Sequence, residues 1–171
     1  NKVKIISKKT DGKKIKKGAI ILKIKGNTRS ILIAERTALN FLGLMSGIAT
    51  KSKIYSDIAR PHGVKIYSTR KTIAGIRDLE KYALTKGGAY INRLSLDDFF
   101  FIKDNHLKNV KNIKDSILKV RKYNPKKKIT VEVDNISQLK KILNEKIDVV
   151  LLDNMNSEQI KKCLKLVNKR F

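Results

Sequence analysis

The sequence predicts a parallel α/β fold, and two observations carry that prediction. From residue 64 onwards, four short apolar runs alternate with longer amphipathic segments, which is the order that βαβ units produce. The apolar runs are nearly continuous and do not alternate with polar residues, as in parallel strands that are covered on both faces. We therefore expect parallel strands connected by helices, with both faces of the sheet covered.

A strand and two helical segments are expected before this region. The sequence AIILKIKG alternates weakly and ends on glycine, which favours a strand. Asn27 or Thr28 can cap the helix that follows, and Gly47 is expected to interrupt it. The predicted elements are, in order, a strand at 19–26, helical segments at 34–47 and 50–59, and a turn at 60–63.

The later region is expected to contain four strands and four helices, each helix with an apolar stripe at its 3.6-residue period. The strands are predicted at 64–67, 99–102, 128–133 and 147–152, and the helices at 75–88, 110–125, 136–143 and 157–169. The inward stripes are Ile76, Leu79 and Ala83 in the first helix, Ile113, Ile117 and Val120 in the second, and Ile160, Cys163, Leu164 and Val167 in the last.

Polar and charged side chains follow all four of these strands. They are Ser68, Thr69, Arg70 and Lys71, then Lys103, Asp104, Asn105 and His106, then Glu132, Asp134 and Asn135, and finally Asp153 and Asn154. In parallel α/β folds, reactive residues collect at the carboxyl ends of strands, so we expect one site there. Arg70, Lys71 and Lys103 suit an anionic ligand, whereas Glu132 and Asp153 suit Mg²⁺ bridged to phosphate, or ribose hydroxyls.

Composition limits the partners and the compartment. The net charge of +25 favours polyanions such as nucleic acid, acidic membranes or phosphorylated metabolites, but the lysines are spread along the whole chain. No apolar run approaches the roughly 20 residues of a membrane helix, so no membrane partner is expected. The N-terminal residues show no signal-peptide pattern, and the single Cys163 fits a reducing compartment. A cytoplasmic location is therefore expected.

Seven motifs along the chain point to one family. They are AERTALNFLGLMSGIAT, STRKTIAG, LEKYA, KGG, IKDNH, VEVDN and LLDNM. In order and spacing the sequence resembles the quinolinate phosphoribosyltransferases, or carboxylating nicotinate-nucleotide pyrophosphorylases, most closely from Ala34 to His106 and from Thr130 to Met155. The resemblance implies that quinolinate attacks 5-phosphoribosyl-1-pyrophosphate with substrate-bound Mg²⁺, releasing pyrophosphate and CO₂ and giving nicotinate mononucleotide for NAD synthesis.

The resemblance also implies an architecture. Residues 1–46 would be the remnant of an N-terminal α/β sandwich domain with an interface helix, and residues 47–171 a partial α/β barrel that carries catalysis. A homodimer or larger assembly is implied, with the active site at the interface. Against the family pattern the chain is short at both ends, so truncation is expected, with the loops that bind the ribose 5′-phosphate falling after Phe171.

Individual residues take roles from the same resemblance. The implied substrate-binding residues are Arg36 from the neighbouring subunit, Thr69, Arg70, Asn92 and Arg93. The implied catalytic residues are Lys71, Lys103, Glu132 and Asp153, and the two carboxylates also lie near the metal ion. The chain departs from the family pattern at Ser68 (usually Asp), Ala74 (usually Pro) and Asn92 (usually His).

Two alternative functions remain open from the sequence. One is a basic nucleic-acid-binding protein, which the net charge of +25 favours. The lysines are dispersed and Phe99, Phe100 and Phe101 are expected to be buried, so we expect nucleic acid to bind only nonspecifically. The other alternative is an inactive fragment of the enzyme.

Overall fold

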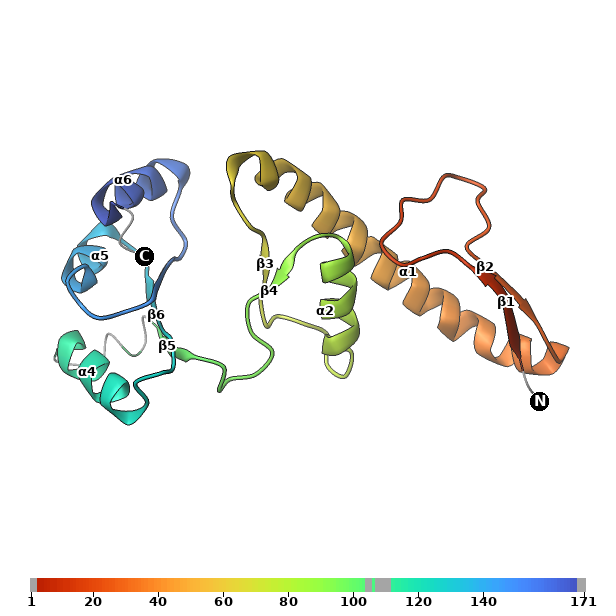
Figure 1. Cartoon of the computed structure of the whole chain (residues 1–171), viewed down its shortest axis with the longest axis horizontal. Coiled ribbons are helices and arrows are strands. Elements are labelled where there is room, and N and C mark those ends of the chain that lie inside the picture. Colours follow the sequence, from red (N-terminus) through yellow and green to blue (C-terminus); the bar gives the residue numbers. More distant parts are fainter. Residues whose placement is uncertain (1–2, 104–105, 107–111, 169–171) are drawn as a thin grey trace. The chain divides into compact units, whose positions relative to one another are not determined.

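The computed structural model describes residues 3–103, 106 and 112–168. The chain forms two compact units, Asn1–Leu94 and Ser95–Phe171 (Figure 1). The first contains β1 (Lys4–Lys8), β2 (Leu22–Lys25), α1 (Thr28–Ala59), a short 3₁₀ helix η1 (Arg60–His62), β3 (Tyr67–Ser68), α2 (Arg77–Lys86) and β4 (Tyr90–Ile91). The second contains β5 (Phe100–Ile102), α4 (Ile113–Tyr123), β6 (Ile129–Val133), α5 (Ile136–Ile142), β7 (Val149–Leu152) and α6 (Ser157–Val167).

The second unit is a three-stranded parallel sheet with helices on one side (Figure 1). The central strand is β6, and β5 and β7 pair with it on either side. Its fully buried side chains come from the strand β6 and the three helices: Ile117, Ile129, Val131, Val133, Leu139, Ile142 and Cys163. These residues form one apolar core, and the predicted parallel α/β fold is confirmed.

Asparagine begins every helix of this second unit that the structure describes. The side chains of Asn112, Asn135 and Asn156 accept hydrogen bonds from backbone N–H groups in the first turns of α4, α5 and α6. At the start of α6 the bond is reciprocal, because Gln159 also accepts from the backbone N–H of Asn156. Such caps provide acceptors for N–H groups that have no partner within the helix, and so they fix the residue at which each helix begins.

The first unit is organised around the long helix α1. Strands β1 and β2 form an antiparallel hairpin, and β3 and β4 a parallel pair. The C-terminal part of α1 packs on α2, where Ser52, Ser56 and Ala83 are buried. The helices meet closely at Gly87, where an added Cβ would lie 2.3 Å from the carbonyl oxygen of Ala49. That space admits glycine alone, so Gly87 sets the approach of the two helices.

One expectation about the helices is wrong, and two strands were not expected. Gly47 does not interrupt α1, because one glycine lowers helix stability by only about 1 kcal/mol and the flanking residues continue the helix. The sequence also gave no prediction of β1 or β4; β4 has only two residues, too few for a periodicity to appear.

The expected burial also differs in places. Leu79 and Leu164, assigned to inward stripes, are 46% and 60% exposed. The faces that α2 and α6 bury are centred on other residues, Lys81 and Ala83 in α2 and Cys163 in α6. Phe99, Phe100 and Phe101 are half-buried, and of the predicted strand only Ile102 is buried. The expected cover on both faces is absent from β7, where Val149 and Leu151 are 42% and 40% exposed.

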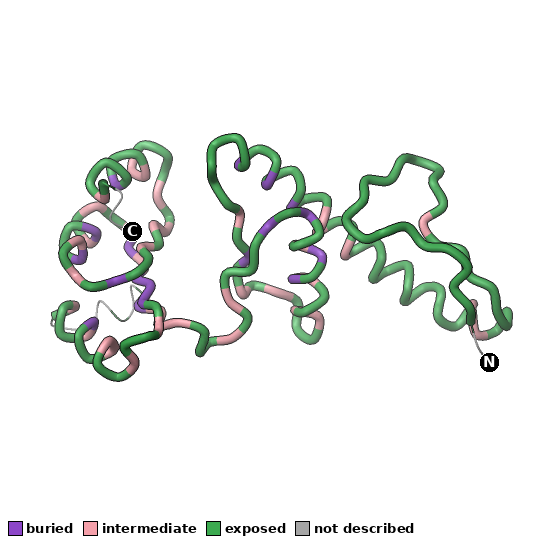
Figure 2. The backbone as a smooth tube through the Cα atoms, viewed as in Figure 1, coloured by how far each residue is buried: buried purple, intermediate pink, exposed green. Residues whose placement is uncertain are grey.

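The N-terminal half of α1 is exposed (Figure 2). Among the described residues, one helical segment, Thr28–His62, is long and apolar enough to cross a membrane, with a mean hydropathy of 1.3 over 18 residues. The expectation from apolar run length did not anticipate this segment. Its longest stretch without a charged residue is the 14 residues Thr37–Thr50, shorter than the roughly 20 residues that span a bilayer.

A charged network ties together the amino ends of β6 and β7. The Arg121 guanidinium donates to the carboxylate of Asp148 at 2.7 Å and to the carbonyls of Pro125, Lys127 and Lys146. The same carboxylate accepts from the backbone N–H of Ile129 at 2.8 Å. Burial would raise the pKa of Asp148, but the Ile129 and Arg121 hydrogen bonds and the Arg121 charge outweigh it and lower the pKa.

This lowered pKa predicts an acid-dependent loss of stability. The contribution of the Asp148 carboxylate is complete above its unfolded pKa of about 3.9, and it is lost as pH falls through the lower folded pKa. We expect Asp148→Asn to reduce the free energy of unfolding at pH 7 by about 1 kcal/mol, since both partners are partly exposed. In urea unfolding measured at a series of pH values, the difference in free energy of unfolding between the unaltered protein and Asp148→Asn should shrink below about pH 4. Glu145→Gln, a carboxylate on the loop between α5 and β7, is the control, and a pH-independent difference for Asp148→Asn would contradict the assignment.

Candidate functional site

Three carboxylates gather at the carboxyl ends of β6 and β7. Oxygen atoms of Glu132, Asp134 and Asp153 all lie within 4.8 Å of one another, and each residue is half-buried. The strand register explains the grouping. Glu132 pairs with Leu151, so Asp134 and Asp153, each two residues further on, project to the same face of the sheet as Glu132. From the sequence, Asp134 was expected at this strand end, but the ribose or metal role was given to Glu132 and Asp153 alone; the structure adds Asp134 to their cluster.

Lys103 follows β5 on the same face of the sheet. Phe101 pairs with Thr130, and two residues onward in each strand are Lys103 and Glu132. The Lys103 side chain is exposed, with its ammonium 5.5 Å from the centre of the Phe101 ring. The His106 ring nitrogen Nδ1 accepts a hydrogen bond from the Lys103 backbone N–H at 3.0 Å. The predicted site residues Asp104 and Asn105 lie outside the described residues.

In the first unit, cationic residues follow β3 and β4. Arg70 and Lys71 come after β3, and Asn92 and Arg93 after β4, and the two strands are paired in parallel. The carboxyl ends of these strands are therefore adjacent. Lys71 and Asn92 are exposed, whereas Arg70 and Arg93 are half-buried. The pairing brings four of the predicted site residues to one edge of this small sheet.

Helix α2 holds the loop that carries Arg70. The Arg77 Nε atom donates to the hydroxyl of Thr72 at 3.0 Å, and the Glu80 carboxylate accepts from the backbone N–H of Ile73 at 3.1 Å. Within the loop, the Thr69 hydroxyl accepts from the backbone N–H of Lys71 at 3.1 Å. These hydrogen bonds fix the backbone of the loop that carries Arg70 and Lys71.

Lys81 is a buried lysine in this region that sequence reasoning missed. It is 3% exposed, and its ammonium donates to the Ser68 hydroxyl at 2.9 Å, to the Thr69 carbonyl at 3.2 Å and to the Arg93 carbonyl at 2.8 Å. Hydrophobic periodicity could not find it, because a lysine counts as polar wherever it falls on a helix. The signal available in the sequence was its place in the LEKYA motif.

Arg70 has an unused donor. Its Nε atom is buried and has no hydrogen-bond partner among the described residues. A buried donor without a partner costs about 1–3 kcal/mol, and such cases in a folded protein call for an explanation. A bound carboxylate or phosphate would accept from this atom, so the observation favours an anionic ligand at Arg70.

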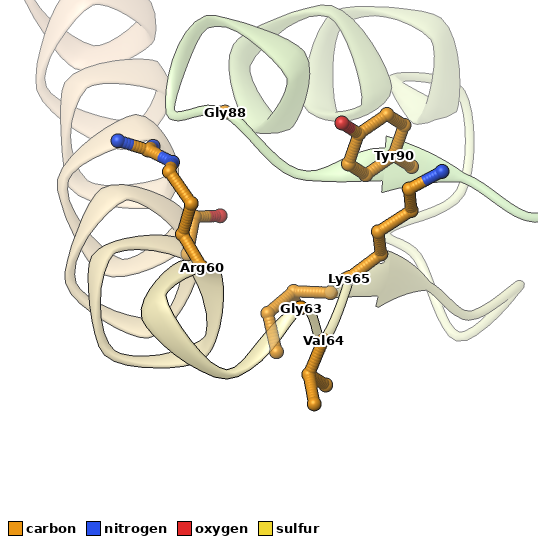
Figure 3. A pocket seen from close by; sticks show the side chains of 8 residues that line it. Arg60, Gly63, Val64, Lys65, Gly88 and Tyr90 are labelled. Atoms are coloured by element: carbon orange, nitrogen blue, oxygen red, sulfur yellow. The ribbon is translucent and has the colours of Figure 1, made fainter.

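Arg36 and a pocket near the end of α1 lie away from these strand ends. Arg36 is on the exposed N-terminal half of α1. A pocket of about 170 Å³ lies between the end of α1 and the starts of β3 and β4, with Arg60 on one side and Lys65 and Tyr90 on the other (Figure 3). It is therefore at the amino ends of these strands, opposite to the edge that carries Arg70, and we do not assign the site to it.

The structure thus groups the predicted residues into two sets. Cationic and amide side chains, Arg70, Lys71, Asn92 and Arg93, belong to the first unit, and Lys103 with the carboxylates to the second. The convergence of both sets on one cavity stays a prediction. Fold and strand ends together define a parallel α/β protein with a cationic edge and an acidic edge, each suited to part of a charged ligand.

Comparisons with known proteins identify the family. The family model "Quinolinate phosphoribosyl transferase, C-terminal domain" matches residues 48–171, and "Quinolinate phosphoribosyl transferase, N-terminal domain" matches residues 1–46. The chain therefore belongs to the quinolinate phosphoribosyltransferase family, as the resemblance implied. The exact domain boundary expected at residues 46 and 47 lies within the continuous helix α1 and stays a prediction.

Named relatives agree. The chain is 40% identical over 151 residues to the nicotinate-nucleotide pyrophosphorylase [carboxylating] of Mycobacterium leprae, covering 88% of this chain and 53% of the relative. It is 39% identical over 171 residues to the probable enzyme of that name from Methanothermobacter thermautotrophicus, covering 98% and 61%. The crystal structure of nicotinate-nucleotide pyrophosphorylase from Ehrlichia chaffeensis superposes with a TM-score of 0.93 at 38% identity, covering 98% and 61%. The chain thus spans little more than half the length of these proteins.

The acidic cluster predicts a gain in stability when one charge is removed. Like charges about 5 Å apart repel by about 1 kcal/mol in a solvent-like medium. With a chelator present, we expect Asp134→Asn to raise the free energy of unfolding by up to about 1 kcal/mol in urea titrations. Glu145→Gln, on the loop between α5 and β7 and outside the cluster, should change it less. Lower stability of Asp134→Asn would show that the three carboxylates do not repel one another as their spacing implies.

Proposed function

We propose that this protein transfers the phosphoribosyl group of 5-phosphoribosyl-1-pyrophosphate to quinolinate, with loss of CO₂, giving nicotinate mononucleotide and pyrophosphate. Family membership motivates the reaction. The observation that carries it to this chain is the buried, unpartnered Nε atom of Arg70 on the loop that follows β3. It supports an acceptor of negative charge as the ligand, and quinolinate supplies two carboxylates.

The cationic edge is assigned to quinolinate. Arg70 and Arg93 follow adjacent parallel strands, and arginine can bind a carboxylate through two parallel hydrogen bonds. Thr69 and Lys71 flank Arg70, and the exposed Asn92 can donate a hydrogen bond where the family pattern has histidine. Fixed cations would hold the two carboxylates of the substrate and aim its ring nitrogen at the sugar. That nitrogen is itself a nucleophile, so no general base is required.

The acidic edge is assigned to the sugar and its metal ion. Mg²⁺ prefers oxygen ligands, and the oxygens of Glu132, Asp134 and Asp153 are close enough together to fit it, directly or through water. When bound, Mg²⁺ would neutralise charge on the departing pyrophosphate. Carboxylates near the ribose also favour a transition state with positive charge on the sugar, and Lys103, on the same face of the sheet, can contact phosphate.

A homodimer is proposed through the N-terminal half of α1. This part of the helix exposes apolar side chains from several turns: Leu32, Ile33, Leu39, Phe41, Leu42 and Leu44. Exposed apolar surface of this extent is typical of interaction sites. Arg36 lies on the same half-helix, so a dimer formed there would bring Arg36 to the interface, where it could reach a neighbouring active site.

Two further proposals rest on composition. A cytoplasmic location is supported by the single buried cysteine, which suits a reducing compartment. Binding to nucleic acid stays a prediction of nonspecific, salt-sensitive contact, supported by the net charge of +25.

Binding measurements test the proposed substrate. We expect calorimetry to detect quinolinate binding, and Arg70→Ala to weaken it about 10- to 100-fold, since hydrogen bonds to charged groups contribute about 1.5–3 kcal/mol. Lys126→Ala, which removes one positive charge from an exposed turn, is the matched control and should bind normally. Product formation is then followed with Mg²⁺ and the sugar donor. Equal affinity in the Arg70 variant and the unaltered protein would reject the assignment of the cationic edge.

Sedimentation tests the proposed dimer. We expect the 19.5 kDa chain to sediment at twice its mass or more, and Leu39→Lys to shift it towards monomer because a charge replaces an apolar contact. Tyr123→Lys, an exposed change on α4, should leave the mass unchanged. A monomer at every concentration tested would exclude the α1 interface.

A further inference from the structure

We propose that Lys81 is a positioning residue, whose buried ammonium holds the Arg70 and Arg93 segments together as one anion-binding unit. The inference deepens the proposed function and depends on it for the ligand, a pyridine dicarboxylate. The three oxygens bound by Lys81 belong to two separate segments of chain: Ser68, the last residue of β3, with Thr69 directly after it, and Arg93 after β4. The lysine therefore links the two segments on which the cationic side chains are mounted.

The sheet alone does not provide this link. Strands β3 and β4 pair through only two residue pairs, Tyr67 with Tyr90 and Ser68 with Ile91. The pairing ends before Arg70 and Arg93. Lys81 bonds to the carbonyls of Thr69 and Arg93, and so connects the two segments beyond the last strand pair. The Thr69 carbonyl belongs to the same planar peptide unit as the Arg70 nitrogen and Cα atoms. The hydrogen bond from Lys81 therefore fixes the orientation of the peptide plane that carries Arg70.

The chemistry of lysine suits this task. An ammonium has three N–H donors, and the three oxygens can accept all of them. Burial of a charged group is costly unless it is hydrogen-bonded. A conformation in which the two segments separate would leave the buried ammonium without some of its acceptors, and is therefore disfavoured. Helix α2 is also fixed to the Arg70 loop through Arg77 and Glu80, which makes it a stable base for the lysine. Small relative shifts of Arg70 and Arg93 are thereby resisted.

Four variants separate positioning from general stability. Lys81→Met keeps the length of the side chain and removes its charge and donors. Lys81→Arg keeps the charge with a planar donor arrangement that cannot serve three oxygens around one nitrogen. Ser68→Ala removes one bond and leaves both carbonyl bonds. Lys86→Met is the control, because Lys86 is an exposed lysine on the same helix.

Hydrogen exchange and quinolinate calorimetry are measured on the full chain. For Lys81→Met we expect faster amide exchange in residues 67–73 and 90–95, unchanged exchange in the α1 segment that packs on α2, and about tenfold weaker quinolinate binding. In assays of the proposed reaction, the Michaelis constant for quinolinate should rise and that for the sugar donor should not. Ser68→Ala should change each value less, and Lys86→Met should match the unaltered protein.

Each outcome decides between the two proposals. If the unaltered protein binds quinolinate and Lys81→Met binds it equally, the positioning role is overturned and the proposed function stands. If the unaltered protein binds no quinolinate, the proposed function fails, and hydrogen exchange alone tests whether Lys81 links the two segments. Faster exchange in both residues 67–73 and residues 90–95 of Lys81→Met supports the link. Unchanged exchange in either segment overturns it. If exchange rises throughout the first unit, Lys81 serves stability alone. Should Lys81→Met not fold, Lys81→Arg gives the same readouts, and unchanged values there overturn the proposal.

Discussion

The alternation of side chains along β6 is the constraint on which the second unit depends. Because successive residues of a strand point to opposite faces, Ile129, Val131 and Val133 enter the apolar core while Glu132 lies on the other face. A shift of one residue in the pairing would bury the carboxylate and expose the valines. The core therefore fixes the register, and the register places Glu132, Asp134 and Asp153 together. Packing and chemistry in this unit are two consequences of one pattern.

Sequence reasoning recovered those features that repeat. The alternation of strands and helices, the carboxyl-end position of Glu132 and Asp153, and the Ile117 stripe of α4 all follow from periodicity and order. The features it missed depend on tertiary contacts. Leu79 was assigned inward because it is apolar, yet the face of α2 that packs on α1 is chosen by close approach at Gly87.

Lys81 shows the same limit for a polar residue. Its burial depends on oxygens supplied by two loops that are brought together only in the folded chain. Hydrophobic periodicity is a property of one helix at a time. It therefore predicts an exposed lysine, because it contains no information about hydrogen-bond acceptors on other segments. Asp134 is a milder case, since it was recognised at a strand end but not as a member of the carboxylate cluster.

The acidic cluster also has a consequence for the order in which ligands arrive. It is a small negative region on a protein whose overall charge is +25, and the field of an exposed charge decays over about 8 Å at physiological salt. A free divalent cation approaches such a surface against the field, whereas a polyphosphate that already carries the cation is drawn towards it. If the proposed magnesium ion and sugar donor bind at this acidic edge, the charge distribution would favour metal delivered together with its anion over metal recruited alone from solution.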